Sequence, residues 1–184
     1  MKTILFLGNS LTEGWGLFPG QSMPDLIQNK IQDSGLPYVH INGGYRGDTS
    51  GQALSKLKRY LSLSPSGSVD VCVIELGTND WMQGYSVADI ESNLTTILAT
   101  LRSSNSAMVL ALIEMRSFPG FRQGEEYDSL FSKFSKRNSI ALIPFPLTAV
   151  ITNDSLLQSD GVHPNAKGTE LYADEVWKYL FPLL

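Results

Sequence analysis

Apolar residues occur along this chain in two kinds of segment: short unbroken runs and longer stretches with helical spacing. The runs are rich in Val, Ile and Leu and show little polar alternation, which is typical of strands buried on both faces. They predict strands at Thr3–Leu7, Tyr38–Ile41, Val69–Leu76, Met108–Ile113 and Ile140–Ile143.

Between these runs, apolar residues recur every three or four positions, a spacing that predicts helices. In the first such stretch Met23, Leu26, Ile27 and Ile31 share one face, and Gly35 follows as a stop signal. The predicted helices are Ser22–Ser34, Ser50–Leu63, Val87–Ser103, Glu125–Arg137 and Ala166–Leu180.

The regular alternation of strands and helices predicts the fold class. Strands joined through helices form right-handed crossovers, and these build a parallel sheet that is covered on both faces. We therefore expect a three-layer α/β/α sandwich with a flavodoxin-like central parallel sheet of five strands. A length of 184 residues fits one such domain, so residues 1–184 are predicted to form a single domain.

Composition excludes several classes of protein. The formal net charge is 14 − 18 = −4, whereas nucleic-acid binding needs a basic face. The apolar runs are far shorter than the ~20 residues of a membrane-spanning helix. One cysteine, Cys72, permits neither an internal disulfide nor a cysteine-based zinc site, and its place within a strand predicts an inert core residue. The sequence does not predict the oligomeric state.

The first residues also bear on the cellular compartment. The apolar run after Met1 is too short for a signal peptide and continues into Gly8 and Asn9 without a small-residue cleavage site. The start at Met1 favours the cytoplasm, with the mature form of an exported protein as the alternative.

Polar segments follow the predicted strands, at the edge where open α/β sheets bind ligands. These segments are Gly8-Asn9-Ser10-Leu11-Thr12, residues 42–49, Gly77-Thr78-Asn79-Asp80 and, before the last helix, Asp160-Gly161-Val162-His163-Pro164. Together they supply a hydroxyl, backbone amides, a side-chain amide, a carboxylate and an imidazole. Serine-based acyl transfer requires these same groups.

The four segments resemble, in order, the four conserved blocks that define the SGNH (GDSL-type) hydrolases. The matching residues are Gly8, Ser10 and Leu11; Asn42, Gly47, Asp48 and Thr49; Gly77, Asn79 and Asp80; and Asp160 and His163. The resemblance extends from Leu7 to the last helix. Within the family the chain most resembles the compact bacterial thioesterase I / lysophospholipase type.

This resemblance implies a serine esterase with Ser10 as nucleophile, His163 as general base and Asp160 as the acid that orients it. It also implies that the backbone N–H groups of Ser10 and Gly47 and the side-chain amide of Asn79 form the oxyanion hole. The expected substrates are small acyl esters, acyl thioesters or lysophospholipids, and no metal or cofactor is expected. The spacing of Asp160 and His163 agrees, because three residues in a glycine-containing turn let the carboxylate reach one ring nitrogen.

One position departs from the family pattern. The first block usually reads Gly-Asp-Ser, and this chain has Asn9 in place of the aspartate. Asparagine keeps an acceptor for nearby backbone amides but removes a negative charge beside the nucleophile. Because Asp160 supplies the acid of the mechanism, we expect Asn9→Asp to preserve activity within a modest factor.

Other polar residues near these blocks are expected to be structural. Asp48 with Thr49 is predicted to cap the second helix, and Asn42 and Asp80 to support their loops. The second histidine, His40, lies within a strand and is interpreted as a structural residue.

Two loops are predicted to shape the acyl site. Their apolar side chains suggest substrate-binding roles for Trp81, Met82, Met115, Phe118 and Phe121. Packing of the same side chains over the edge of the sheet is an equally good interpretation.

Two other functions remain as alternatives. One is a carbohydrate O-acetylesterase, which would need a small acetyl pocket and a polar platform. The other is a non-catalytic flavodoxin-like module that binds a ligand such as a phosphate at the first loop. That loop contains neither Gly-x-Gly-x-x-Gly nor a Gly-Lys-Ser/Thr ending, which disfavours the second alternative.

Overall fold

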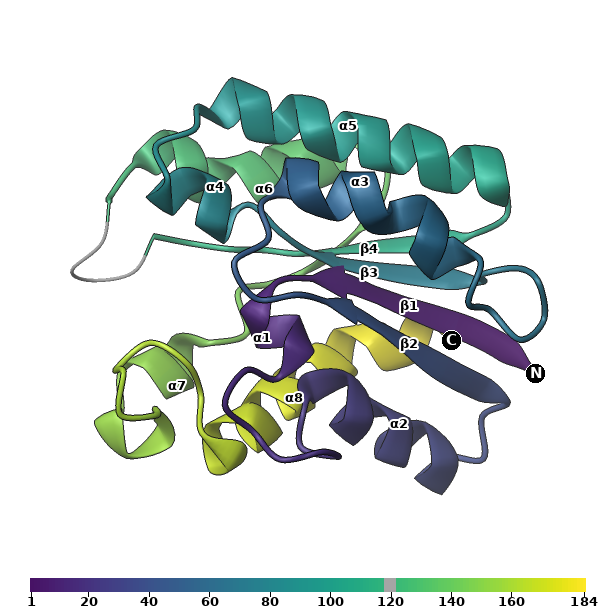
Figure 1. Ribbon diagram of the computed structural model, residues 1–184, viewed down its shortest axis with the longest axis horizontal. Coiled ribbons are helices and arrows are strands. Elements are labelled where there is room, and N and C mark those ends of the chain that lie inside the picture. Colours follow the sequence, from purple (N-terminus) through teal and green to yellow (C-terminus); the bar gives the residue numbers. More distant parts are fainter. Residues whose placement is uncertain (118–121) are drawn as a thin grey trace.

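The centre of the molecule is a parallel sheet, seen in a computed structural model that describes residues 1–117 and 122–184. Its strands are β1 (Lys2–Gly8), β2 (Tyr38–Gly44), β3 (Val71–Glu75), β4 (Val109–Ile113) and β5 (Ala141–Ile143). They lie in the order β2-β1-β3-β4-β5, and every neighbouring pair is parallel (Figure 1). This is the flavodoxin-like strand order, so the predicted sheet is confirmed.

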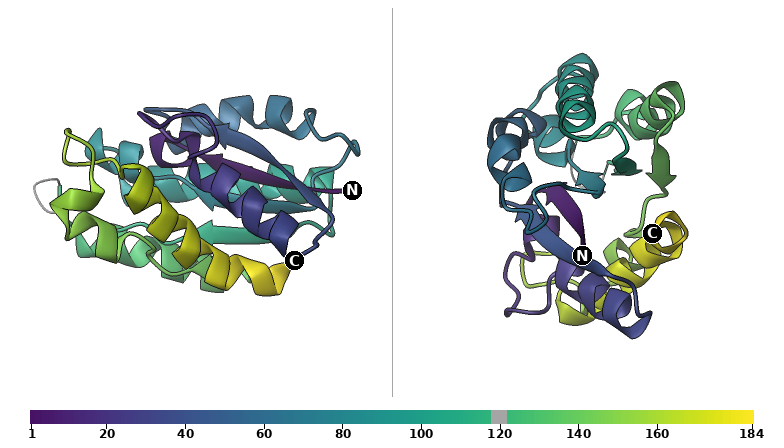
Figure 2. Two further views of the ribbon diagram at one scale, coloured as in Figure 1. Left: turned by 90° about the horizontal axis from the view of Figure 1, so that it is seen from below. Right: turned by 90° about the vertical axis from the view of Figure 1, so that its right-hand side faces the viewer.

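Helices cover both faces of the sheet, as predicted (Figures 1 and 2). One layer contains α2 (Met23–Asp33) and α8 (Ala166–Leu180), and the other contains α3 (Ser50–Leu61), α5 (Val87–Ser104) and α6 (Glu125–Asn138). Shorter elements, which the sequence pattern did not predict, are α1 (Ser10–Glu13), α4 (Thr78–Met82), α7 (Thr148–Ile151), η1 (Asp154–Leu156) and η2 (Phe181–Leu183). The three-layer α/β/α sandwich is therefore confirmed.

Side-chain caps fix where the long helices begin. Ser86 and Asp89 form a reciprocal capping box at the start of α5. The Asn165 side chain accepts a hydrogen bond of 3.0 Å from the backbone N–H of Gly168 at the start of α8. Such caps satisfy backbone donors that have no partner within the helix.

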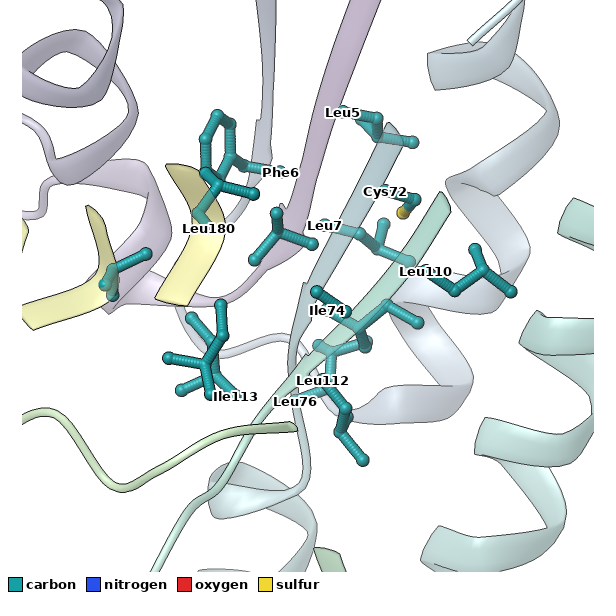
Figure 3. Close-up of a cluster of buried hydrophobic side chains, with 14 of the residues drawn as sticks. Leu5, Phe6, Leu7, Cys72, Ile74, Leu76, Leu110, Leu112, Ile113 and Leu180 are labelled. Atoms are coloured by element: carbon teal, nitrogen blue, oxygen red, sulfur yellow. The ribbon is translucent and has the colours of Figure 1, made fainter. Parts of the chain in front are cut away.

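The core lies on both sides of the sheet. The side chains from Ile4 to Leu7 in β1 are almost completely buried, which explains why this strand reads as an unbroken apolar run. Phe6 lies beside Leu180 of α8, whereas Leu5 and Cys72 lie on the other side of the strands (Figure 3). Burial of each Leu-sized side chain stabilises the fold by about 1.5–3 kcal/mol.

The register brings three strand ends together at one edge. Gly8 at the end of β1 is paired with Gly44 of β2 and with Glu75 of β3. The chain leaves β1 toward β2 and later returns to the other side of β1 as β3. Such a switch point is where open α/β sheets bind ligands.

Among the described helices, none has the combination of length and apolar character that crossing a bilayer requires.

Candidate active site

Ser10 lies directly beyond the end of β1, as the first residue of the short helix α1. The Asn9 side chain caps this helix, with Oδ1 accepting a hydrogen bond of 3.0 Å from the Leu11 N–H. The Ser10 N–H lies at the helix N-terminus, where backbone donors have no intrahelical partner. No hydrogen bond within the described part of the chain uses it. The turn thus presents both a hydroxyl and a free backbone donor.

The His163 ring lies between Ser10 and Asp160. Its Nε2 is 2.9 Å from Ser10 Oγ, and its Nδ1 is 2.7 Å from Asp160 Oδ2. A carboxylate at Nδ1 holds the proton on that nitrogen, which leaves Nε2 free to accept the serine proton. The two residues that meet at Nε2 are 153 positions apart in the sequence.

Asp160 shapes its own turn as well as orienting the ring. Its second oxygen, Oδ1, accepts hydrogen bonds from the backbone N–H groups of Val162 (2.9 Å) and His163 (3.0 Å). Burial alone would raise the pKa of this carboxyl, but these two N–H groups and the His163 ring lower it to about 2. Asp160 is therefore ionised at neutral pH.

Gly47 and Asn79 belong to neighbouring loops that are tied together. The Asn79 side-chain amide donates a hydrogen bond of 2.9 Å to the carbonyl of Asp48, the residue after Gly47. Gly47 has a φ of +76°, a conformation that favours glycine. Its N–H makes no hydrogen bond with the described residues. One further N–H of the Asn79 amide also remains available, so each loop has an unused donor.

A cavity of about 80 Å³ opens beside Ser10. It is lined by Asn9, Ser10, Leu11, Thr78, Asn79, Met82, Val162 and His163. The structure thus brings Ser10, Asn79 and His163 together around one space. Sequence reasoning did not identify Leu11, Thr78 and Val162 as its walls, although all three lie within the four segments that follow the predicted strands or precede the last helix.

The prediction of substrate-binding residues is only partly matched. Met82 lines the cavity, whereas Met115 is fully buried and Trp81 is only 3 % exposed. The Trp81 ring stacks on Tyr127 at 5.0 Å, and its indole N–H donates to the Arg122 carbonyl. The burial of Trp81 and Met115 agrees with the alternative interpretation that these side chains pack over the edge of the sheet, and a substrate-binding role for them stays a prediction. Phe118 and Phe121, predicted for the same role, lie outside the described residues.

The residues predicted to support the loops do so, with one change of partner. Thr49 caps α3, but Asp48 forms an ion pair of 2.7 Å with Lys56 instead of capping. Asn42 donates to the Thr12 carbonyl at 3.0 Å and so joins β2 to α1. Asp80 accepts a hydrogen bond of 2.8 Å from the Ser50 N–H, which joins α4 to α3.

His40 and Cys72 have structural positions, as predicted. His40 contacts Gln28 at 3.2 Å and Asp25 at 3.3 Å, both on α2, and burial lowers its pKa. Burial raises the pKa of the Cys72 thiol, so this group stays protonated and inert. In the ranges 1–117 and 122–184, no group of three or more His, Cys, Asp and Glu side chains could hold a metal ion.

The fold and the hydrogen-bonded series at its edge define the class of protein, a three-layer α/β hydrolase built around a serine. The chain belongs to the GDSL-like lipase/acylhydrolase family, whose sequence model matches residues 6–171.

Similar proteins agree with this assignment. An arylesterase of Vibrio mimicus is 30 % identical over 183 residues, covering 97 % of this chain and 90 % of the relative. The thioesterase 1/protease 1/lysophospholipase L1 of Escherichia coli K12 is 30 % identical over 182 residues, which cover 99 % of this chain and 85 % of the relative. The crystal structure of the psychrotrophic esterase EstA from Pseudoalteromonas sp., inhibited by monoethylphosphonate, is similar to this chain with a TM-score of 0.89 at 29 % identity. The match covers 100 % of this chain and 98 % of the EstA chain. The chain is therefore an SGNH-type serine esterase.

Proposed function

We propose that this esterase hydrolyses carboxylic esters of short acyl groups, with Ser10 as nucleophile, His163 as general base and Asp160 as its orienting acid. The observation that carries the proposal is the continuous series Ser10–His163–Asp160, joined by contacts of 2.9 and 2.7 Å beside a cavity. The hydroxyl needs such a base because serine is a weak nucleophile by itself.

In the first half of the reaction Ser10 Oγ attacks the ester carbonyl carbon while its proton moves to His163 Nε2. The carbonyl oxygen becomes an oxyanion, which accepts hydrogen bonds from the N–H groups of Ser10 and Gly47 and from the Asn79 amide. Each such donor stabilises the transition state by about 3 kcal/mol. Ionised Asp160 stabilises the imidazolium.

The C–O bond to the leaving group then breaks, and the His163 imidazolium protonates the departing oxygen. The acyl group now forms an ester with Ser10. Water then attacks that carbonyl and gives its proton to His163, and collapse of the intermediate returns the proton to Ser10 and releases the carboxylic acid.

The size and lining of the cavity support a short acyl group. The cavity volume of about 80 Å³ is far below the roughly 300–1,000 Å³ that is typical of pockets for drug-sized ligands. A small volume next to Ser10 favours a short acyl group. The apolar walls are Leu11, Met82 and Val162. Longer chains would require Met82 to move, and its side chain is both flexible and 42 % exposed.

The same small cavity also favours a second candidate, a carbohydrate O-acetylesterase, because an acetyl group fits it. The relatives described above include an arylesterase and a thioesterase/lysophospholipase. Aryl esters, acyl thioesters, lysophospholipids and acetylated sugars therefore belong in one substrate panel.

The role of Ser10 is tested by Ser10→Ala with p-nitrophenyl butyrate as substrate. We expect kcat to fall by about 10⁴-fold or more, because the hydroxyl forms the covalent intermediate. The circular dichroism spectrum and melting temperature should be unchanged. Ser62→Ala, at an exposed serine that ends α3, is the matched control and should keep full activity. Near-normal turnover by Ser10→Ala would contradict the proposal.

The acyl preference is tested by measuring kcat/KM for p-nitrophenyl esters from acetate to palmitate, beside the other members of the panel. We expect the highest values between acetate and butyrate and a steep fall beyond, since longer chains do not fit the cavity. A maximum at palmitate would refute the short-acyl assignment while leaving the serine mechanism in place. A clear preference for acetylated sugars would identify the second candidate.

A further inference from the structure

A buried carboxyl group lies directly behind the turn that carries Ser10. Glu75 is the last residue of β3 and is only 1 % exposed. Its Oε1 accepts a hydrogen bond of 2.8 Å from the Asn9 side-chain amide. Its Oε2 accepts hydrogen bonds from the Thr12 hydroxyl (2.9 Å) and from the Asn9 backbone N–H (3.4 Å). All three donors flank Ser10 in the sequence.

Gly8 lets the carboxyl approach this closely. A Cβ at Gly8 would lie 2.0 Å from Thr12 Oγ1 and 2.9 Å from Glu75 Oε2. Any side chain there would therefore push the turn and the carboxyl apart. The glycine at the end of β1 thus has a steric purpose that is independent of the oxyanion hole.

The hydrogen bonds between Asn9 and Glu75 have a fixed direction. Asn9 Oδ1 already accepts from the Leu11 N–H at the start of α1, so the amide cannot flip without losing that cap. The NH₂ group of Asn9 is therefore held facing Glu75. An ionised carboxylate, which only accepts hydrogen bonds, is the matching partner for these donors.

We propose that Glu75 is a positioning residue that holds Ser10 in place through Asn9 and Thr12, and that Asn9 is matched to it as an obligate donor. This inference rests on the proposed role of Ser10 as nucleophile. It assigns a purpose to the asparagine that stands where the family usually has aspartate.

Few titratable groups face this carboxyl. Tyr172 of α8 and Tyr127 of α6 interact with it electrostatically, and burial raises the pKa of both hydroxyls, so both are neutral. His163 approaches from the C-terminal loop but contacts Ser10 Oγ. Burial raises the pKa of Glu75 itself to about 7, although the hydrogen bonds from Thr12 and Asn9 act in the opposite direction. A second carboxyl at position 9 would therefore share one proton with Glu75.

The first test is a double-variant cycle of Glu75→Gln, Asn9→Asp and the two together. In Glu75→Gln, an NH₂ donor replaces one acceptor oxygen and faces a donor of Asn9 in either orientation, the side-chain amide in one and the backbone N–H in the other. We expect kcat to fall by about 10- to 100-fold through displacement of Ser10, with KM changed by less than about twofold. In the double variant the donor and the acceptor exchange places, while the remaining oxygen at position 75 still accepts from Thr12. We expect most of kcat to return.

Glu114→Gln is the matched control. Glu114 is another buried carboxyl that directly follows a strand, β4, and it accepts a hydrogen bond of 3.0 Å from the Phe145 N–H. We expect its kcat to stay near that of the wild type. The proposal is overturned if Glu75→Gln loses no more kcat than Glu114→Gln, or if the double variant is no better than the poorer single one.

The pH profile of Asn9→Asp gives a second test, which is decisive even if Glu75→Gln does not fold. At neutral pH the shared proton replaces the amide as donor, so activity should stay within a modest factor of the wild type. As the pH rises, loss of that proton leaves two repelling carboxylates and displaces Ser10. We therefore expect an alkaline loss of kcat that the wild type lacks. Superimposable profiles would overturn the proposal.

Labelling with a p-nitrophenyl phosphonate separates this inference from the proposed function. Mass spectrometry of the labelled wild-type protein locates the nucleophile without reference to Glu75. A label on another residue would refute the role of Ser10. A label on Ser10 together with a null result in the variant cycle would refute the role of Glu75 alone.

Discussion

Asp160 illustrates how one side chain can have two separable roles. Oδ1 builds the turn by accepting from two backbone N–H groups, and Oδ2 contacts the His163 ring. An asparagine at this position can keep the first role, because its carbonyl oxygen still accepts hydrogen bonds. It cannot keep the second, because its NH₂ group faces Nδ1 and favours the wrong ring tautomer.

We therefore expect Asp160→Asn to reduce kcat by about 10²- to 10⁴-fold while the protein stays folded. The reason is loss of the ionised partner of the imidazolium, and the measurement is steady-state hydrolysis of p-nitrophenyl butyrate with a thermal melt as control. A loss of less than about tenfold would show that Asp160 acts only in the turn.

The low pKa of Asp160 means that this carboxyl does not set the acid limb of the pH–activity profile. Because this pKa is about 2, the carboxyl stays ionised through mildly acidic pH. The ionised form stabilises the folded state above the ordinary value of 3.8, and this contribution is lost as the pH falls toward 2. We expect kcat/KM to fall well above that range, because a protonated His163 cannot accept the serine proton. A profile that stays flat from neutral to pH 4 would contradict His163 as base.

The position of a side chain in the site could be predicted where residues that are close in the sequence are also close in space. Ser10 follows a strand and Asp160 precedes His163 by three residues, so motif and geometry coincide. The burial of the Trp81 ring could not be predicted, because its position after Asn79 does not tell which way the ring points. The Glu75 carboxyl was missed because it ends an apolar run, where a single charge gives no periodic signal.

Among the helices, α1 is one that depends on tertiary contacts. It has only four residues and is held by the Asn9 cap and by close packing on β2. A Cβ at Gly44 would lie 2.2 Å from the Glu13 backbone N and 2.7 Å from the Thr12 carbonyl carbon. Backbone atoms cannot rotate away, so a side chain at Gly44 must move the helix that carries Ser10.

We expect Gly44→Ala to lower the free energy of unfolding by about 1–3 kcal/mol through overpacking, and kcat by about 10- to 100-fold through displacement of Ser10. Urea unfolding and steady-state kinetics measure the two effects. Gly35→Ala is the control, because Gly35 has a φ of +66° but open space around it. It should lose some stability and keep kcat; equal kcat for both variants would show that α1 tolerates the shift.

The long elements were predictable because each spans several periods of its pattern and carries end signals such as Ser86 or Asn165. One-turn helices such as α1 and α4 were not, since four or five residues hold too little periodicity. An isolated helix of that length is unstable, so its existence depends on contacts that the local sequence does not show.

Taken as a whole, the molecule is held by one contiguous apolar cluster that includes both helix layers and the sheet. Leu112 of β4 is fully buried within it. We expect Leu112→Ala to lower the free energy of unfolding by about 2–5 kcal/mol, through lost burial and the cavity left behind. Activity per folded molecule should be retained.

Urea denaturation followed by circular dichroism and by residual activity measures this effect and tests the predicted single domain. Coincident transitions would support a cooperative unit over residues 1–184. Loss of activity at a lower urea concentration than loss of helix would contradict it.

The distance in sequence between Ser10 and His163 has a consequence for biosynthesis. The turn that carries Ser10 is translated before His163, and so are strands β1, β2 and β3 beside it. A nascent chain can thus contain the proposed nucleophile and the proposed oxyanion donors before the proposed base has been added. We expect a nascent chain that does not yet contain His163 to lack esterase activity, because the proposed base is missing from it.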